Sequence, residues 1–288
     1  MKRTPLRHGL PLLLALGMAA CKPTAAPAPA AAPAAPAAPA ATTAPVQSAH
    51  APRTERLQAF LQARYGKQAR LSESWSGQAD GQAVQSEVCA EQPVVVGSQI
   101  QQLLAVCHRL DDGGHANPGL IDFLILRDDG QGLAVVAEKL ADGFGSDGDP
   151  GAVDILRLGS DFYGFVVYSS WIGQGLVLES QDLVLPGPKG LVNAGSVRQH
   201  IDNQGALDCS DEGRDPQQTA AQCQAELFDV DFKLAVDDSD PAARVWPVTI
   251  EETGMSCGKK LGTTQVFAFD AARWAYPFPD SMQREACE

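Results

Sequence analysis

The sequence lacks the short motifs that mark several common classes of enzyme. It contains no GxSxG nucleophile elbow, no HExxH pair, no CxxC pair and no phosphate-binding loop. Histidine is scarce, and the spacing of His108, His115 and His200 fits no zinc site. Carboxylates are common, but no defined pair of them stands out as a catalytic site. These absences favour a binding protein over an enzyme.

Positive charge is also in short supply. Lys and Arg number 22 against 35 Asp and Glu, which gives a formal net charge of −13. A protein that binds nucleic acid needs a basic patch to neutralise phosphates, so this composition excludes nucleic acid as the expected partner. A cationic protein is the complementary partner. The alternative is that the acidic surface serves solubility alone.

Long apolar runs are missing too. The longest near the N-terminus, residues 10–20, is shorter than the roughly 20 residues that a membrane span needs. It follows Lys2, Arg3 and Arg7, and a basic start before a short apolar run indicates a secretory signal over residues 1–20.

The end of this signal predicts a lipid anchor. Ala19 and Ala20 stand directly before Cys21, an arrangement that resembles the lipobox of bacterial lipoproteins. The resemblance implies lipidation of Cys21, and Lys22 after it favours the periplasmic face of the outer membrane, with the lipid as the only membrane contact. Ordinary cleavage near Ala20 is the alternative.

Two regions follow the cysteine. Residues 21–51 form an Ala/Pro-rich tether, which buries too little apolar surface to offset its ordering entropy. Residues 52–288 have a length that suits one β-rich periplasmic domain.

Six cysteines remain after Cys21. An even number in an oxidising compartment predicts three disulfides. Pairing neighbours closes the shortest loops and is the preferred arrangement, with other pairings open: Cys89–Cys107, Cys209–Cys223 and Cys257–Cys287.

The apolar pattern predicts an all-β fold with one short N-terminal helix. The helix begins after Thr54 as N-cap, places Leu57 and Leu61 on one face, and ends at Gly66. Short β segments separated by turn residues then favour antiparallel sheets in a sandwich, barrel or propeller-like array. The expected strands are 102–110, 121–127, 133–138, 153–158, 163–169, 176–179, 182–185, 226–236, 243–251 and 263–269.

Two acidic loops are candidate binding sites. In residues 143–154, Asp147, Asp149 and Asp154 offer the hard oxygen ligands that calcium prefers, although a solvated turn explains them as well. The second loop, residues 202–215, is a candidate docking surface for a basic partner. Its candidate residues are Asp202, Asp208, Asp211 and Glu212.

A third candidate is the hairpin expected over residues 163–179. Trp171 and Gln174 stand at a turn framed by glycines, and Tyr163 and Tyr168 lie on the strand before it. Tyr and Trp are favoured anchors in protein interfaces. The alternative is that Trp171 folds back over the sheet as part of the core.

Several segments together resemble a group of periplasmic immunity lipoproteins. The resemblance covers most of residues 100–275 and rests on PGAVDILRLGSDFYGF, WIGQG, DNQGALDCSDEG and TTQVFAFDAARW. Such proteins protect bacteria against peptidoglycan-degrading effectors of bacteria-killing type IV secretion systems. They are similar in kind to β-rich lysozyme inhibitors, which block an enzyme's cleft with a protruding loop.

The resemblance carries implications for individual residues. Lysozyme inhibitors carry a Ser-Gly-x-x-Tyr element, and residues 159–163 offer a related stretch, with Gly159 before Ser160, that ends at Tyr163. The resemblance also implies calcium binding at the loop around Asp147.

The expected function is therefore a non-enzymatic lipoprotein that binds and inhibits a peptidoglycan hydrolase or binds another cationic envelope protein. An envelope scaffold and a calcium-dependent glycan binder, in which Trp171 and the Asp147 loop form the site, are the alternatives.

Overall fold

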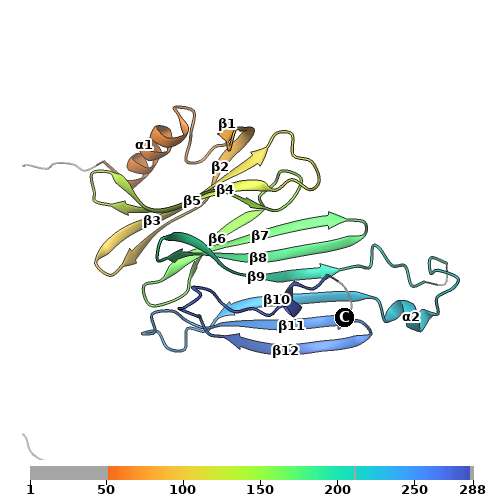
Figure 1. Cartoon of the computed structure of the whole chain (residues 1–288). Coiled ribbons are helices and arrows are strands. Elements are labelled where there is room, and N and C mark those ends of the chain that lie inside the picture. The colour runs from red at the N-terminus through yellow and green to blue at the C-terminus, as the bar shows by residue number, and fades with distance from the viewer. Residues whose placement is uncertain (1–50, 211, 286–288) are drawn as a thin grey trace, which may run out of the picture. The chain divides into compact units, whose positions relative to one another are not determined.

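A computed structural model describes residues 51–210 and 212–285. The strands form two antiparallel sheets, and both sheets belong to one compact unit. The all-β prediction is therefore confirmed, and of the three arrangements expected it is the sandwich that forms (Figure 1).

The first sheet has five strands in sequence order, joined as a meander. Its strands are β1 (Trp75–Ala79), β2 (Gln82–Val96), β3 (Gln99–Leu110), β4 (Gly119–Asp128) and β5 (Leu133–Phe144). The helix α1 (Arg53–Tyr65) precedes them.

The second sheet has seven strands and continues the meander in the order β12-β11-β10-β9-β8-β7-β6. They are β6 (Ala152–Arg157), β7 (Tyr163–Gly173), β8 (Leu176–Gly187), β9 (Gly190–Asp202), β10 (Phe228–Val236), β11 (Val248–Ser256) and β12 (Lys259–Phe267). A short helix α2 (Ala220–Gln224) lies between β9 and β10, and a 3-10 turn (Asp280–Gln283) follows β12.

Apolar side chains fill the spaces on both faces of the first sheet. Alternate residues of β3 and β4, such as Leu104 and Leu124, pack against Leu57 and Leu61 of α1. The residues between them face a second cluster, in which Phe123 of β4 meets Phe165 of β7 at a ring-centroid distance of 5.0 Å. The order of layers is therefore helix, first sheet, second sheet.

The start of the helix differs from the prediction. The helix begins at Arg53, so Thr54 lies inside its first turn and not at the N-cap. Pro52 precedes it, and its carbonyl accepts the amides of Glu55 and Arg56. Proline favours this place because its fixed φ suits a helix start and its missing N–H costs nothing there. Gly66 ends the helix as predicted.

Two of the predicted disulfides are present. Cys89 of β2 joins Cys107 of β3, and Cys209 joins Cys223 of α2. Cys257 is also disulfide-bonded. Cys287, which the sequence pairs with it, lies outside the described residues, as does Cys21.

Removal of the Cys89–Cys107 bridge gives a first testable expectation. Replacing both cysteines by serine is expected to lower the free energy of unfolding by about 2–3 kcal/mol, because the unfolded chain regains the freedom of the 18-residue loop. Urea unfolding under oxidising conditions measures the change. Equal midpoints for the variant and the parent would contradict it.

Candidate functional site

Loops that the sequence singled out separately meet at one end of the second sheet. We call this region the tip surface. It comprises residues 111–118, 145–150, the β7–β8 turn with its flanking residues 170–176, and 203–215 except 211. Figure 1 shows the β7–β8 turn and the exit from β9 toward α2 at the same end of the sheet.

The β7–β8 turn is tighter than expected. β7 continues to Gly173 and β8 starts at Leu176, so only Gln174 and Gly175 lie between them. Both have positive φ, 53° and 77°, as a two-residue hairpin turn requires. A Cβ at Gly175 would lie 2.2 Å from the Ala206 nitrogen, so the turn packs directly against the loop after β9.

On the other side of the turn, Trp171 and its neighbour Ser170 contact the loops at residues 111–118 and 145–150. Its ring lies 5.6 Å from the His115 ring, centroid to centroid. His115 Nδ1 is 3.1 Å from Asp147 Oδ1, and Ser146 Oγ donates to the Ser170 carbonyl of β7 at 3.0 Å. Trp171 is therefore half-buried beneath the surface. The side chain that projects is Ile172, which is 61% exposed, next to the exposed Gln174.

The tip surface carries mostly negative charge. Asp147, Asp208 and Glu212 are exposed. The Ser210 amide and hydroxyl hold the pKa of Asp208 below its usual value, so this carboxylate is charged at neutral pH. Asp202 is half-buried, and its Oδ1 accepts the Gln204 amide at 2.6 Å. Asp211 lies outside the described residues.

The three aspartates proposed as calcium ligands do not come together. Asp147 faces His115, while Asp149 pairs with Arg109 and accepts the Gly151 amide. Asp154 lies exposed on β6. In residues 51–210 and 212–285, no three His, Cys, Asp or Glu side chains are grouped to hold a metal ion.

The two tyrosines of β7 lie away from the tip surface. Tyr168 is half-buried in the middle of the strand, where burial and the nearby Asp154 raise its pKa. Tyr163 begins β7 at its opposite end, where the Arg157 guanidinium lies 5.8 Å from its ring centroid. The predicted binding residues therefore do not form one site, because neither tyrosine lies with Trp171 and Gln174 at the tip surface.

A buried polar cluster beneath α1 was not predicted. His108 and Ser86 are each 2% exposed, and Ser86 Oγ lies 2.8 Å from His108 Nδ1. Asp122 Oδ2 lies 3.4 Å from His108 Nε2 and accepts the Tyr65 hydroxyl at 2.9 Å. The signal in the sequence was a single carboxylate within the apolar strand β4, because an Asp is rarely buried without partners.

The cluster has the residue types of a hydrolase triad but a different arrangement. In such triads the serine contacts Nε2 and the carboxylate contacts Nδ1. Here the two contacts are exchanged, and the serine hydroxyl is buried between the helix and the sheet. The cluster therefore joins α1 to β2, β3 and β4 as a packing element.

None of the helices in the described ranges is long and apolar enough to cross a membrane. In comparisons with known proteins, no family model, no curated protein and no solved structure matches the chain.

Proposed function

We propose that this chain is a non-enzymatic binding protein of the bacterial envelope that captures and blocks a cationic peptidoglycan hydrolase. The observation that supports this most is the tip surface. There an exposed aliphatic side chain, Ile172, lies on β7 just before the two-residue hairpin turn, between acidic loops. An apolar anchor within a ring of charge is typical of protein interfaces.

The hairpin is built to keep its shape on binding. β7 and β8 pair continuously from Phe165↔Val184 to Gly173↔Leu176, and β6 and β9 pair on either side of them. Contacts of Trp171 with His115 and of Gly175 with Ala206 brace the turn from both sides. A preorganised loop loses little entropy on binding, which favours tight association with an enzyme cleft.

The acidic side chains have a different part in the proposal. Exposed carboxylates such as Asp147 and Asp208 attract a basic enzyme and orient it toward the hairpin. Once the hairpin enters the cleft, it excludes the glycan strand from the catalytic carboxylates. The proposed site of action is the periplasm, with Cys21 lipidated and the domain held at the outer membrane.

Affinity capture tests the binding part of the proposal. The protein, produced without its lipid and immobilised, is exposed to secreted and periplasmic proteins from its source. We expect recovery of a basic peptidoglycan hydrolase by the parent protein and its loss with the Ile172→Lys variant. Recovery of other envelope proteins alone would instead favour a scaffold.

Salt dependence gives a second testable expectation. Raising the ionic strength from about 0.05 M to about 0.5 M should lower the association rate constant about tenfold and change the dissociation rate little, because exposed charges are screened. Surface plasmon resonance with the captured hydrolase measures both rates. In a variant with Asp147→Asn and Asp208→Asn, the association rate should depend less on salt. An association rate independent of salt in the parent protein would contradict the role of the acidic loops.

A further inference from the structure

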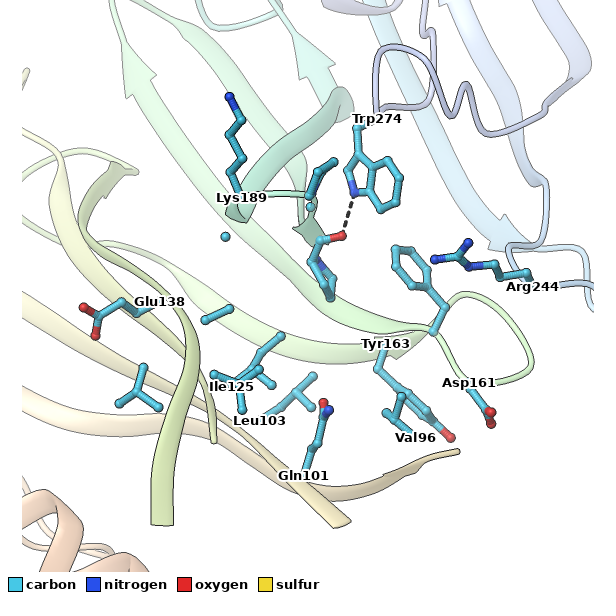
Figure 2. A pocket seen from close by; sticks show the side chains of 18 of the residues that line it. Val96, Gln101, Leu103, Ile125, Glu138, Asp161, Tyr163, Lys189, Arg244 and Trp274 are labelled. Carbon is cyan, nitrogen blue, oxygen red and sulfur yellow. Dashed lines mark hydrogen bonds between the residues drawn. The ribbon is translucent and has the colours of Figure 1, made fainter. Parts of the chain in front are cut away.

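A large pocket opens between the two sheets at the end remote from the tip surface. Its volume is about 1040 Å³, at the upper end of what small-molecule sites span. Figure 2 shows its two walls: Leu103 and Ile125 come from the first sheet, and Tyr163 and Trp274 from the opposite side. Phe162 and Val96 extend this apolar surface, and Val135 and Val136 of the edge strand β5 continue it toward solvent.

The mouth of the pocket carries two positively charged side chains, Arg244 and Lys189. Two acids lie there as well: Glu138 pairs with Arg64 at 2.7 Å, and Asp161 accepts the Gly97 amide at 3.2 Å and keeps its negative charge. In the described ranges, neither Arg244 nor Lys189 pairs with a carboxylate. Figure 2 shows the Arg244 guanidinium turned toward the space beside Trp274. The chain as a whole has a net charge of −13, yet two basic side chains lie at the mouth of this apolar pocket.

Trp274 is held in an unusual backbone conformation at this mouth. Its φ is 58°, in the left-handed region that bulky residues rarely occupy. Its indole Nε1 donates to the Pro186 carbonyl at 2.6 Å, and its ring meets Phe269 edge to face at 5.5 Å. The turn is fixed by reciprocal backbone hydrogen bonds between Asp270 and Ala275. Such strain persists where the surroundings impose it, and it concentrates at ligand sites.

We infer that this pocket binds an anionic amphiphile, with its acyl chain between the apolar walls and its acidic head group at Arg244. The walls offer burial to a hydrocarbon chain, which is favourable in proportion to the apolar area removed from water. The guanidinium offers two parallel donors to a carboxylate or phosphate. A neutral apolar ligand would gain no charge-assisted hydrogen bond from the exposed Arg244 guanidinium. The site lies apart from the tip surface, so its test is independent of hydrolase binding.

Titration with defined amphiphiles tests the inference. The purified protein is first loaded with a dansyl-labelled fatty acid. Palmitate, lysophosphatidylglycerol and hexadecanol are then added separately as competitors that displace this probe. We expect saturable one-to-one binding of palmitate or lysophosphatidylglycerol, and the tighter of the two identifies a free fatty acid or a phospholipid as the source. Hexadecanol, which has the same chain and no charge, should bind at least tenfold more weakly.

A pair of matched variants locates the head group. Arg244→Gln should weaken binding of the acidic amphiphile about tenfold, a factor equal to roughly 1.4 kcal/mol. Arg273→Gln removes the same charge from a neighbouring exposed residue that does not line the pocket, and it should leave binding unchanged. Both side chains are exposed, so the variants should unfold at the parent's temperature. Absence of saturable binding, equal affinity for hexadecanol, or equal effects of the two variants would overturn the inference.

Discussion

Replacing Asp122 by alanine is expected to lower the free energy of unfolding by about 3–5 kcal/mol, because each buried hydrogen-bonding group that loses its partner costs about 1–3 kcal/mol. Asp122 accepts the Tyr65 hydroxyl at 2.9 Å and the Ala141 amide at 2.8 Å, and it lies 3.4 Å from His108 Nε2. Its loss leaves the Tyr65 hydroxyl and the Ala141 amide without their common acceptor beneath α1. The helix should then detach more readily from the first sheet.

Chemical denaturation followed by far-UV circular dichroism measures this loss. Asp154→Ala is the matched control, because Asp154 is an exposed aspartate on a strand, and it should shift stability by no more than about 0.5 kcal/mol. Equal unfolding midpoints for Asp122→Ala and Asp154→Ala would show that the cluster contributes nothing to the fold.

Asp122 also makes the free energy of unfolding depend on pH in the acidic range. Burial alone would raise the pKa of Asp122, but the contacts with His108, the Ala141 amide and Tyr65 outweigh burial and hold the pKa below its usual value. The folded state therefore favours the ionised carboxylate. This stabilisation is complete above the unfolded-state pKa and is lost as pH falls through the lower folded-state pKa. The difference in stability between the parent and Asp122→Asn should shrink over that interval.

The second large effect is expected at the tip surface. Ile172→Lys should weaken binding of the hydrolase by about 100-fold, because it removes the exposed apolar anchor and sets a positive charge against a cationic partner. Loss of a central anchor costs about 2 kcal/mol or more, and every 1.4 kcal/mol is about tenfold. Isothermal titration calorimetry with the captured hydrolase measures the affinity.

Val266→Lys is the control for this substitution. Val266 is 62% exposed on the edge strand β12 and pairs with Thr249 near the start of β11, away from the β7–β8 turn. The charge change and the loss of an exposed aliphatic side chain are therefore matched. If both lysine variants bind like the parent protein, the hairpin is not the anchor.

The fold class and many strands could be predicted because alternation and turn residues are local signals. The strands that were not predicted contain polar residues that interrupt the alternation of apolar and polar side chains. β2 contains Glu87, Glu91 and Pro93, and it is a strand because β3 pairs with it from residue 84 to residue 96, while β1 pairs with its first five residues. β9 contains Gly195 and two bulges, and its neighbours β8 and β10 determine its conformation. Residues 176–185 were divided at Ser180, although one strand runs through them.

The separate segments of the candidate site could be predicted from the sequence, but their assembly into one surface could not. The sequence singled out Trp171 for its glycine-framed turn and the acidic loops for their charge, but only the fold brings His115 against Trp171 and Asp147, and residue 206 against residue 175. Arg244 and Trp274 were not predicted as pocket residues. Neither carries a local pattern: Arg244 comes from the loop between β10 and β11, and Trp274 reaches the pocket because the segment after β12 returns to the end of β8.

Titration of the captured hydrolase with this protein tests the central claim most directly. Residual peptidoglycan hydrolysis is followed at a fixed enzyme concentration while the molar ratio of protein to enzyme rises, with lysozyme-type hydrolases assayed in parallel. Capture and blocking by the tip surface predict that activity of the cognate enzyme falls close to zero near a one-to-one ratio, and that Ile172→Lys fails to inhibit there. A hydrolase that stays fully active with the parent protein in stoichiometric excess would contradict the proposed function.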